Sequence, residues 1–461
     1  MKKNINPQIF REYDIRGLVD VDLTQESTEL IGKSIGTYIY RNGGKTLTVG
    51  YDMRASSTPF RDSLIRGINS TGCDVIDIGM VPTPVAYFSL HHLKPDGGVM
   101  ITGSHNPSEF NGFKISNGLH SLYGESIQEL RRLIDSDDFE LGSGKLSKDN
   151  VLEDYIQDIF NRVKVSRSVK VVVDGGNGCF GIVGPKLLKR IGANIIELYC
   201  EPDGNFPNHH PDPTVEKNML DLSKKVKEER AELGIGFDGD ADRIGIVDEK
   251  GEILWGDQLL MIFARDILKY NPGATIVGEV KCSQNLFKDI EGHGGIAVMS
   301  AAGHSLIKNK MQETNSLLAG EMSGHICFAD DYYGFDDAIY AACRILQIVA
   351  SSKIKVSEML LDVPKTEATP EIRVDCPDNR KFEIVRELTE SFRKKYDVID
   401  IDGVRVNFGE GWALIRASNT QPVIVFRFEA NNAGRLAEII SIVRKAVSKY
   451  EPIFTLSQEL C

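Results

Sequence analysis

The sequence predicts an α/β protein with three similar α/β domains, each with a mixed sheet, and a smaller C-terminal α+β domain. One observation is a pattern of strand, loop, helix, glycine and returning strand that occurs three times, as βαβ units do. A second is a change after about Lys365 to short β-rich runs flanked by helices. The 461 residues require several domains, because single hydrophobic cores stop growing at about 250–300 residues.

The three copies share an apolar strand, a polar or glycine-rich loop, a helix and an apolar return strand. Proline at the start of a helix supports two of the helices, because the ring fits the first turn. Functional residues in such folds lie on the loops beyond the carboxyl ends of the strands. The copies are strands 47–50 and 75–78 with a helix from Thr58, strands 171–174 and 195–198 with a helix over 185–191, and strands 275–278 and 296–298 with a short helix between them.

The gaps between these units predict four domains, 1–149, 150–250, 251–365 and 366–461. An amphipathic helix over 152–163 leads into the second domain, and the polar stretch 366–370 is expected to be the hinge of the last one. The last domain is expected to contain a strand near Ile372, a helix with Phe382, Val385 and Leu388, three β-rich runs up to Phe428, and a final helix over 433–447.

The net charge and the cysteine content indicate which binding partners and which cellular compartment to expect. A formal net charge of −12 argues against nucleic acid and anionic membrane, which both select basic surfaces. No apolar run has the length of a membrane span or of a signal peptide core. The eight cysteines are scattered without metal-binding or disulfide spacing. We therefore expect a cytoplasmic protein with reduced thiols, no nucleic-acid partner and no membrane partner.

The run Thr102-Gly-Ser-His-Asn-Pro107 follows the short apolar strand 97–101 and ends it in a tight polar loop. Ser104 would present its hydroxyl there, and Lys114 lies on the next strand about ten residues later. A serine in such a loop is more often turn chemistry than a nucleophile. There is no Gly-x-Ser-x-Gly elbow, and ordinary ester hydrolysis is therefore not supported.

Asp238, Asp240 and Asp242 alternate between two predicted strands and predict a cation site. Carboxylates this close repel one another unless a cation neutralises them, and an all-oxygen ligand set suits Mg²⁺ or Ca²⁺. An EF-hand loop is rejected, because Arg243 occupies the position that needs glycine and the flanking elements are strands.

Two further loops carry polar groups suited to a phosphorylated sugar. Glu321 and Ser323 would point the same way from an extended chain, toward neighbouring hydroxyls, and His325 could exchange protons near neutral pH. The run Arg416-Ala-Ser-Asn-Thr420 has the composition of a phosphate-binding loop, and Arg11–Gly17 could contact an anion. Taken alone, the loop with Glu321 is better explained as a turn, and a polar turn explains the other two loops at least equally well.

Together and in this order, the four motifs Thr-Gly-Ser-His-Asn-Pro, Asp-Gly-Asp-Ala-Asp-Arg, Gly-Glu-Met-Ser-Gly-His and Arg-Ala-Ser-Asn-Thr resemble those of the α-D-phosphohexomutases, most closely the bacterial phosphomannomutase/phosphoglucomutase branch. The resemblance covers essentially the whole chain. It implies four domains around a central cleft, one Mg²⁺ per chain, a hexose phosphate substrate, glucose 1,6-bisphosphate as activator, and a monomer.

The resemblance also implies roles for individual residues. Ser104 would be the phosphoserine and, with Asp238, Asp240 and Asp242, would hold Mg²⁺. Glu321 and Ser323 would bind sugar hydroxyls. Other positions match the family's cleft. The matches implied in catalysis are Arg16, Lys114, Arg243 and His325, with His325 ahead of Lys114 as the base. The matches implied in substrate binding are Tyr13, Lys281, His304, Arg416, Ser418, Asn419 and Thr420.

The implied activity is reversible phosphoryl transfer between the 1- and 6-positions of mannose or glucose phosphates, through phospho-Ser104 and a bisphosphorylated sugar. Met322 resembles the mannose/glucose type, whereas phosphoglucosamine mutases usually have glutamine there, which leaves that activity as the alternative. A non-catalytic sugar-phosphate sensor would have lost Ser104 or an aspartate, and the sequence retains them. A phosphatase would need water to reach phospho-Ser104.

Overall fold

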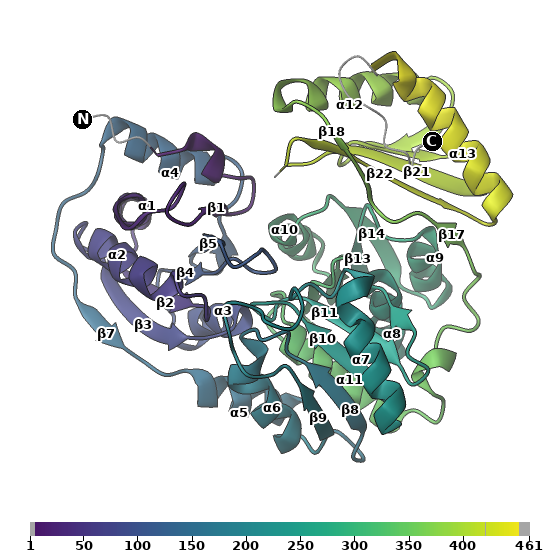
Figure 1. Cartoon of the computed structure of the whole chain (residues 1–461), viewed down its shortest axis with the longest axis horizontal. Coiled ribbons are helices and arrows are strands. Elements are labelled where there is room, and N and C mark those ends of the chain that lie inside the picture. The colour runs from purple at the N-terminus through teal and green to yellow at the C-terminus, as the bar shows by residue number, and fades with distance from the viewer. Residues whose placement is uncertain (1–4, 420, 451–461) are drawn as a thin grey trace.

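The computed structural model describes residues 5–419 and 421–450, which form four sheets with their own helices (Figure 1). The first sheet lies at the left of the view, the second and third form the lower body, and the yellow-green C-terminal part lies at the upper right. The fold class that the sequence predicts is therefore confirmed. None of the described helices combines the length and the apolar character that crossing a membrane requires.

The first sheet has seven strands in the order β1-β5-β4-β2-β3-β7, with β6 paired to β5. Its strands are β1 (Ile15–Leu18), β2 (Thr46–Tyr51), β3 (Asp74–Met80), β4 (Gly97–Ile101), β5 (Phe110–Asn117), β6 (His120–Ser121) and β7 (Leu146–Lys148). Its helices are α1 (Gln25–Arg41), α2 (Ser57–Asn69), α3 (Thr83–His92) and α4 (Glu125–Ser136).

The second and third sheets follow in chain order. The second contains β8 (Lys170–Asp174), β9 (Asn194–Leu198), β10 (Leu233–Phe237), β11 (Ile244–Asp248) and β12 (Ile253–Leu254), with helices α5 (Leu152–Arg162), α6 (Phe180–Arg190) and α7 (Glu216–Glu229). The third contains β13 (Thr275–Glu279), β14 (Ile296–Ser300), β15 (Leu318–Gly320) and β16 (Ile326–Phe328), with helices α8 (Gly256–Tyr270), α9 (Gln284–Gly292), α10 (His304–Thr314) and α11 (Ala338–Ser351).

These three sheets share one topology. Three neighbouring strands run parallel and the next one runs antiparallel, in the orders β3-β2-β4-β5, β9-β8-β10-β11 and β14-β13-β15-β16. β4 and β10 are buried along their whole length, which explains their continuous apolar sequence. A short loop joins the third parallel strand to the antiparallel one in each sheet, and these equivalent loops carry Ser104, the three aspartates and Glu321.

Helix α6 begins five residues earlier than the sequence predicted, at Phe180 instead of Pro185. Pro185 lies inside the helix, where its ring removes one backbone hydrogen bond. The earlier start is explained by packing, because the Phe180 ring stacks on Phe237 of β10 with 3.8 Å between the ring centroids. Burial of this aromatic pair outweighs the missing bond.

The last sheet is entirely antiparallel, in the order β17-β22-β21-β20-β19 with β18 paired to β22. Its strands are β17 (Glu367–Ala368), β18 (Ile372–Asp375), β19 (Asp397–Ile399), β20 (Val404–Asn407), β21 (Gly411–Ala417) and β22 (Val423–Ala430), and its helices are α12 (Asp378–Arg393) and α13 (Ala433–Val447). Val385 and Leu388 of α12 face the core as expected, whereas Phe382 is exposed.

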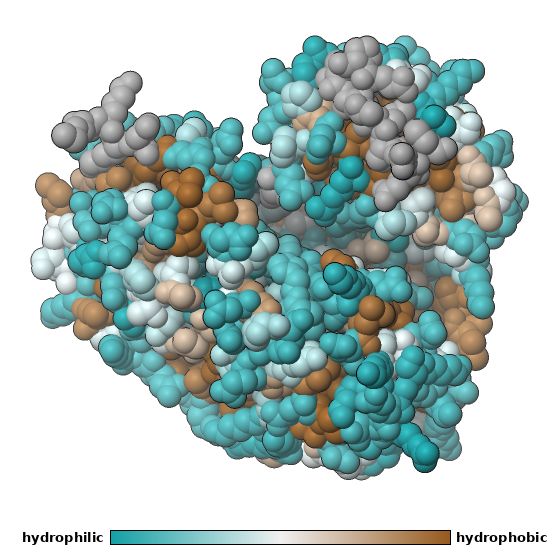
Figure 2. All heavy atoms as spheres, viewed as in Figure 1, coloured by the Kyte–Doolittle hydropathy of each residue, from teal (hydrophilic) through white to brown (hydrophobic). Residues whose placement is uncertain are grey.

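The apolar packing distinguishes this last part from the rest. One cluster joins residues of the first three sheets, the first domain has a further cluster of its own, and the C-terminal sheet and its two helices form another. A small cluster of Val280, Trp412 and Leu414 connects the third domain to the last. A recess separates the N-terminal and C-terminal parts in the space-filling view (Figure 2). Residues of the four motifs nevertheless make contacts between domains.

Candidate active site

The serine loop joins β4 to β5 and buries Ser104, which is 2% exposed. Its backbone is left-handed, with φ +50°, an uncommon conformation for a residue other than glycine. The hydroxyl donates to Oδ2 of Asp238 at 3.0 Å and lies 3.2 Å from Nδ1 of His105. The loop therefore delivers the serine oxygen directly to the first of the three aspartates.

Arg54 holds this loop in place, and sequence reasoning missed it. Its guanidinium donates to the backbone carbonyl oxygens of Ser104 (2.8 Å), Asn106 (2.6 Å), Pro107 (2.6 Å) and Phe110 (3.0 Å). Nε also donates to the buried carboxylate of Asp52 at 3.1 Å. The available signal was an Asp-x-Arg sequence in the loop after β2, at the carboxyl edge of the sheet.

The three aspartates lie between β10 and β11 and are all completely buried. One carboxylate oxygen from each lies within 4.8 Å of the others. Burial and the charges of Asp240 and Asp242 raise the pKa of Asp238 well above its ordinary value. Oδ1 of Asp240 is buried without a hydrogen-bond partner. Buried carboxylates with an unsatisfied oxygen fit a hard divalent cation.

Two groups from the first domain contact these carboxylates. Thr83 donates to Oδ2 of Asp240 at 2.6 Å, and Lys114 donates to the same oxygen at 2.8 Å and also to Oδ2 of Asp242. Burial disfavours the charged form of Lys114, yet Asp240 and Asp242 hold its pKa well above the ordinary value. Lys114 therefore carries a positive charge into the acidic cluster.

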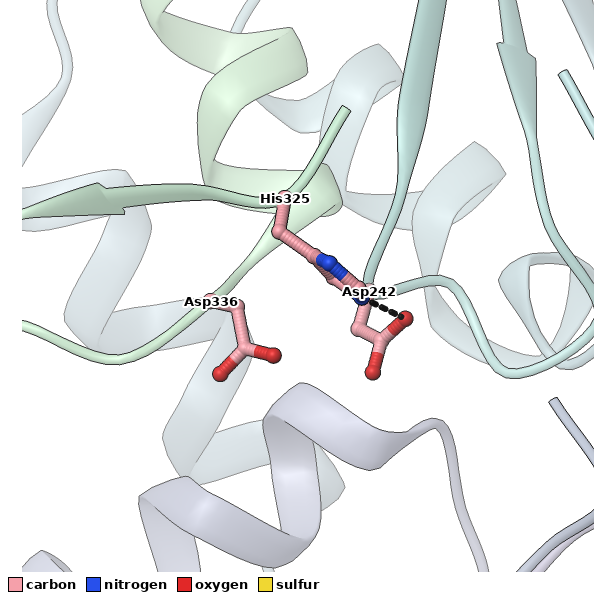
Figure 3. Close-up of side chains that lie close together, drawn as sticks. All are labelled: Asp242, His325 and Asp336. Atoms are coloured by element: carbon pink, nitrogen blue, oxygen red, sulfur yellow. Dashed lines mark hydrogen bonds and ion pairs between the residues drawn. The ribbon is translucent and has the colours of Figure 1, made fainter. Parts of the chain in front are cut away.

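His325 connects the aspartate loop to the sugar-type loop (Figure 3). Its Nε2 lies 3.2 Å from Oδ1 of Asp242, and its Nδ1 lies 2.7 Å from Oε2 of Glu321. Burial opposes protonation, but the two carboxylates raise the pKa of His325 to about 9. The pKa of Glu321 falls to about 2, since its pairing with His325 outweighs burial. With both ring nitrogens donating to carboxylates, the contact of 3.3 Å from Nε of Arg243 is not a hydrogen bond.

The loop 321–325 forms a tight turn, in which the amide of Glu321 donates to the carbonyl oxygen of His325 at 3.0 Å. The loop is therefore a turn, the geometry that the sequence favours for this motif taken alone, and the extended alternative is not adopted. Glu321 and Ser323 still reach the same point, since both contact Nδ1 of His325. Oε1 of Glu321 accepts the amide of Gly303 at 2.7 Å, which ties the turn to the start of α10.

Arg416 lies near the end of β21, and Asn419 follows in the loop after it and reaches the first domain. Nε of Arg416 pairs with Asp402 at 2.9 Å, and Nδ2 of Asn419 donates to the hydroxyl of Tyr13 at 2.8 Å. That hydroxyl donates in turn to the carbonyl oxygen of Ala302 at 2.8 Å. Tyr13 thus links the first, third and fourth domains. Of the other predicted residues in this loop, Ser418 is buried, and Thr420 lies outside the described residues.

The remaining predicted residues are placed as follows. Arg16 donates to Asn106 of the serine loop at 2.9 Å and pairs with Asp14 at 2.5 Å. Lys281 pairs with Glu371 of the last domain at 2.9 Å. His304 opens α10 with its ring centroid 5.6 Å from that of His325.

A buried serine beside three buried carboxylates, a carboxylate–imidazole loop and a basic loop on a separate domain are the arrangement expected of one class of protein, the phosphoryl-transfer enzymes that act on phosphorylated polyols. Comparison with known proteins narrows this class. Domains I, II and III of phosphoglucomutase/phosphomannomutase (alpha/beta/alpha) match residues 7–140, 153–251 and 255–366, and the C-terminal domain matches 371–446. The chain belongs to the phosphoglucomutase/phosphomannomutase family.

Individual relatives agree with this membership. A phosphomannomutase/phosphoglucomutase from Pseudomonas putida is 46% identical over 96% of this chain and 96% of its own. A phosphoglucomutase from Neisseria meningitidis serogroup A is 41% identical over 95% of this chain and 96% of its own. The crystal structure of a family protein from Burkholderia thailandensis superposes with a TM-score of 0.92 at 39% identity, covering 98% of this chain and all of that one.

Proposed function

We propose that this enzyme interconverts the 1- and 6-phosphates of mannose and glucose through a phosphorylated Ser104. Phospho-Ser104 gives its phosphoryl group to the free hydroxyl of the sugar phosphate, so that the bond between phosphorus and Oγ breaks and a new phosphate ester forms. The bisphosphorylated sugar then reorients, and its other phosphoryl group returns to Oγ. The observation that carries this proposal is the bond of 3.0 Å from the Ser104 hydroxyl to Asp238, inside the buried acidic cluster.

The acidic cluster supports Mg²⁺ as the cofactor, with one ion per chain. Asp238, Asp240 and Asp242, with an oxygen of phosphorylated Ser104, would hold the ion, and the unpartnered oxygen of Asp240 fits this role. When bound, Mg²⁺ offsets negative charge on the transferring phosphoryl group. Lys114 and Arg243 would add fixed positive charge around the same group, and Arg16 would orient the serine loop through Asn106.

Proton transfer to and from the sugar hydroxyl is assigned to His325, ahead of Lys114. Both are held protonated by neighbouring carboxylates, and each must lose its proton before it can accept another. The pKa of about 9 makes this loss easier for His325 than for Lys114. Because phosphoryl transfer depends mainly on positioning and charge, we expect the proton step to be a modest part of the rate enhancement.

The phosphate that stays on the sugar would bind at the domain interface formed by the C-terminal loop. Arg416, Ser418, Asn419 and Thr420 would supply donors to it, and Tyr13, Lys281 and His304 would complete the contacts. The support is geometric: Tyr13 contacts Asn419, and Lys281 pairs with Glu371 of the last domain. Glu321 and Ser323 would bind the sugar hydroxyls. This single phosphate-binding site must accept the phosphate at either end of the sugar. The bisphosphorylated sugar must therefore reorient between the two transfer steps.

The free thiols of the seven described cysteines support a reducing compartment, and we propose a cytoplasmic location. The formal charge of −12 supports a small-molecule substrate without nucleic-acid or membrane partners. We expect a monomer, which light scattering on the purified protein tests directly.

The substrate assay compares mannose 1-phosphate, glucose 1-phosphate and glucosamine 1-phosphate, with Mg²⁺ and a trace of glucose 1,6-bisphosphate as activator. We expect turnover of the first two. Turnover of glucosamine 1-phosphate alone would replace the proposed substrates with that of a phosphoglucosamine mutase. Release of inorganic phosphate as the main product would indicate a phosphatase, and no conversion of any substrate would favour a sugar-phosphate sensor.

A further inference from the structure

A second group of potential metal ligands lies beside the three aspartates and is not used by the proposed reaction as a metal site. Asp242, His325 and Asp336 each bring one ligand atom within 4.8 Å of the others (Figure 3). They come from three separate segments, and Asp336 lies just before α11. His304 joins them, with its Nδ1 3.6 Å from Oδ2 of Asp336.

Two atoms in this group have no hydrogen-bond partner among the described residues. Oδ2 of Asp336 and Nδ1 of His304 are both buried and unsatisfied, and Asp336 is completely inaccessible to solvent. The great majority of buried polar atoms have a hydrogen-bond partner, so a buried carboxylate oxygen and a buried imidazole nitrogen without one require an explanation. A cation bound between them would supply the missing partner for both.

The spacing of the ligand atoms fits a four-coordinate ion. Bonds of about 2.0–2.1 Å in a tetrahedron place neighbouring ligand atoms about 3.4 Å apart. Oδ1 of Asp242 and Nε2 of His325 are 3.2 Å apart. Oδ2 of Asp336 and Nδ1 of His304 are 3.6 Å apart. These two pairs lie on either side of the ideal value. Asp242, His325 and Asp336 bring ligand atoms within 4.8 Å of one another, and His304 would move closer to become the fourth ligand.

The hydrogen bonds made by the other polar atoms of these side chains are also typical of a metal site. Glu321 binds Nδ1 of His325 at 2.7 Å, which directs Nε2 toward Asp242. Lys308 binds Oδ1 of Asp336 at 2.8 Å and leaves Oδ2 for a ligand. A carboxylate on the second nitrogen of a ligating histidine is the usual arrangement in zinc sites, because it fixes the ring orientation and raises ligand basicity.

We infer that Asp242, Asp336, His304 and His325 form a second cation site, selective for ions of the Zn²⁺ and Co²⁺ class. Two imidazoles and two carboxylates suit such ions, whereas Mg²⁺ prefers oxygen ligands alone. Since Asp242 belongs to both groups, the two ions would share a bridging carboxylate.

This site has a consequence that rests on the proposed function. A Zn²⁺ ion there withdraws His304 and His325 from the substrate, so Zn²⁺ inhibits the mutase even when Mg²⁺ is saturating. If Zn²⁺ binds but does not inhibit the mutase, the proposed roles of His304 and His325 are wrong. The cation site itself is tested by a binding measurement that does not depend on turnover.

The test uses the visible absorption of Co²⁺, which distinguishes four-coordinate from octahedral ions. Co²⁺ is titrated into the full-length protein with Mg²⁺ in large excess, so that the three-aspartate site is occupied. We expect one equivalent of Co²⁺ with a four-coordinate band, which is lost in Asp336→Asn and in His304→Gln. Asp238→Asn, which belongs only to the neighbouring site, is the control and should keep the band.

Because Asp336 is fully buried, its variant is checked for folding by circular dichroism, and the less buried His304 gives an independent result. Absence of a four-coordinate band in the wild-type protein overturns the inference. So does an unchanged band in the folded variants.

Discussion

Nη2 of Arg54 donates a hydrogen bond of 2.8 Å to the carbonyl oxygen of Ser104. The same guanidinium serves three more carbonyl oxygens of the loop and the buried Asp52. A positively charged, planar group at the centre of the loop thus fixes the left-handed conformation of Ser104. The conformation of the nucleophile loop therefore depends on a residue that precedes it by fifty positions.

Replacing Arg54 with Met should lower both stability and turnover. Removing one partner of a buried ion pair costs about 3–5 kcal/mol, because Asp52 and the carbonyl oxygens stay buried without donors. We expect this loss in the free energy of unfolding in urea, and a fall in kcat with little change in KM. Arg66→Met is the matched control on the exposed face of α2, with a change within about 0.5 kcal/mol. Equal stability of the two variants would contradict the role of Arg54.

Asp240→Asn should weaken Mg²⁺ binding at least about tenfold, because cation affinity follows the number of charged oxygen ligands. Isothermal titration calorimetry measures the affinity, and the Mg²⁺-dependent rise in Tm gives a second readout. Glu252→Gln, at an exposed acidic residue between β11 and β12, should bind Mg²⁺ like the wild type. Unchanged affinity in Asp240→Asn would place the ion elsewhere.

Tyr13→Phe should weaken substrate binding and leave the fold intact. The variant keeps the ring but loses the hydroxyl that contacts Asn419 and Ala302. A net loss of about 1 kcal/mol corresponds to an increase of about fivefold in KM or in the Kd of a substrate analogue. Tyr270→Phe, at a side chain 79% exposed, is the control. Identical KM values for both variants would remove Tyr13 from the substrate site.

Asp337 predicts a defined pH dependence of stability. Burial raises its pKa to about 6, although Tyr155, Tyr332 and the amide of Tyr340 donate to it. The folded state therefore binds a proton more tightly than the unfolded state, whose carboxyl has the ordinary value of 3.8. The charged form costs stability above pH 6, and the cost is relieved as the pH falls toward 4.

The corresponding variant is Asp337→Asn. Between pH 7.5 and pH 5 the wild type should gain about 1.4 kcal/mol of unfolding free energy relative to this variant. Urea unfolding at both values measures the difference, with Asp331→Asn at an exposed neighbouring position as the control. Parallel stability curves for the wild type and Asp337→Asn would show that Asp337 does not titrate in this range.

The local elements were predictable because their signals are local. The three βαβ units, the amphipathic helix α5 and the last helix α13 follow from apolar periodicity and glycine positions. The Ser104 and Asp238 loops were also predictable, since each follows an apolar strand and carries an unusual concentration of polar groups. The start of α6 was not, because its position depends on the tertiary contact of Phe180 with Phe237.

The partners of the motif residues were not predictable from the sequence. Arg54, Thr83, Asp336 and Asp402 each contact a residue that is not a neighbour in the sequence, through tertiary packing within one domain or, for Thr83, between two domains. No spacing rule connects Asp402 to Arg416, or Lys308 to Asp336, before the strands, helices and loops of each domain are packed together. A turn at Glu321 was expected, but its closure by backbone hydrogen bonds and by His325 was not predictable from the sequence.

The central claim is that Ser104 carries the phosphoryl group, and labelled glucose 1,6-bisphosphate tests it most directly. Mixed with the Mg²⁺-loaded enzyme, the labelled compound should transfer label to one peptide, which mass spectrometry identifies as the one containing Ser104. Unlabelled glucose 1-phosphate should then remove the label as sugar bisphosphate. Ser104→Ala should take up no label and show no mutase activity. Stable labelling of another residue, or full mutase activity in Ser104→Ala, would contradict the account.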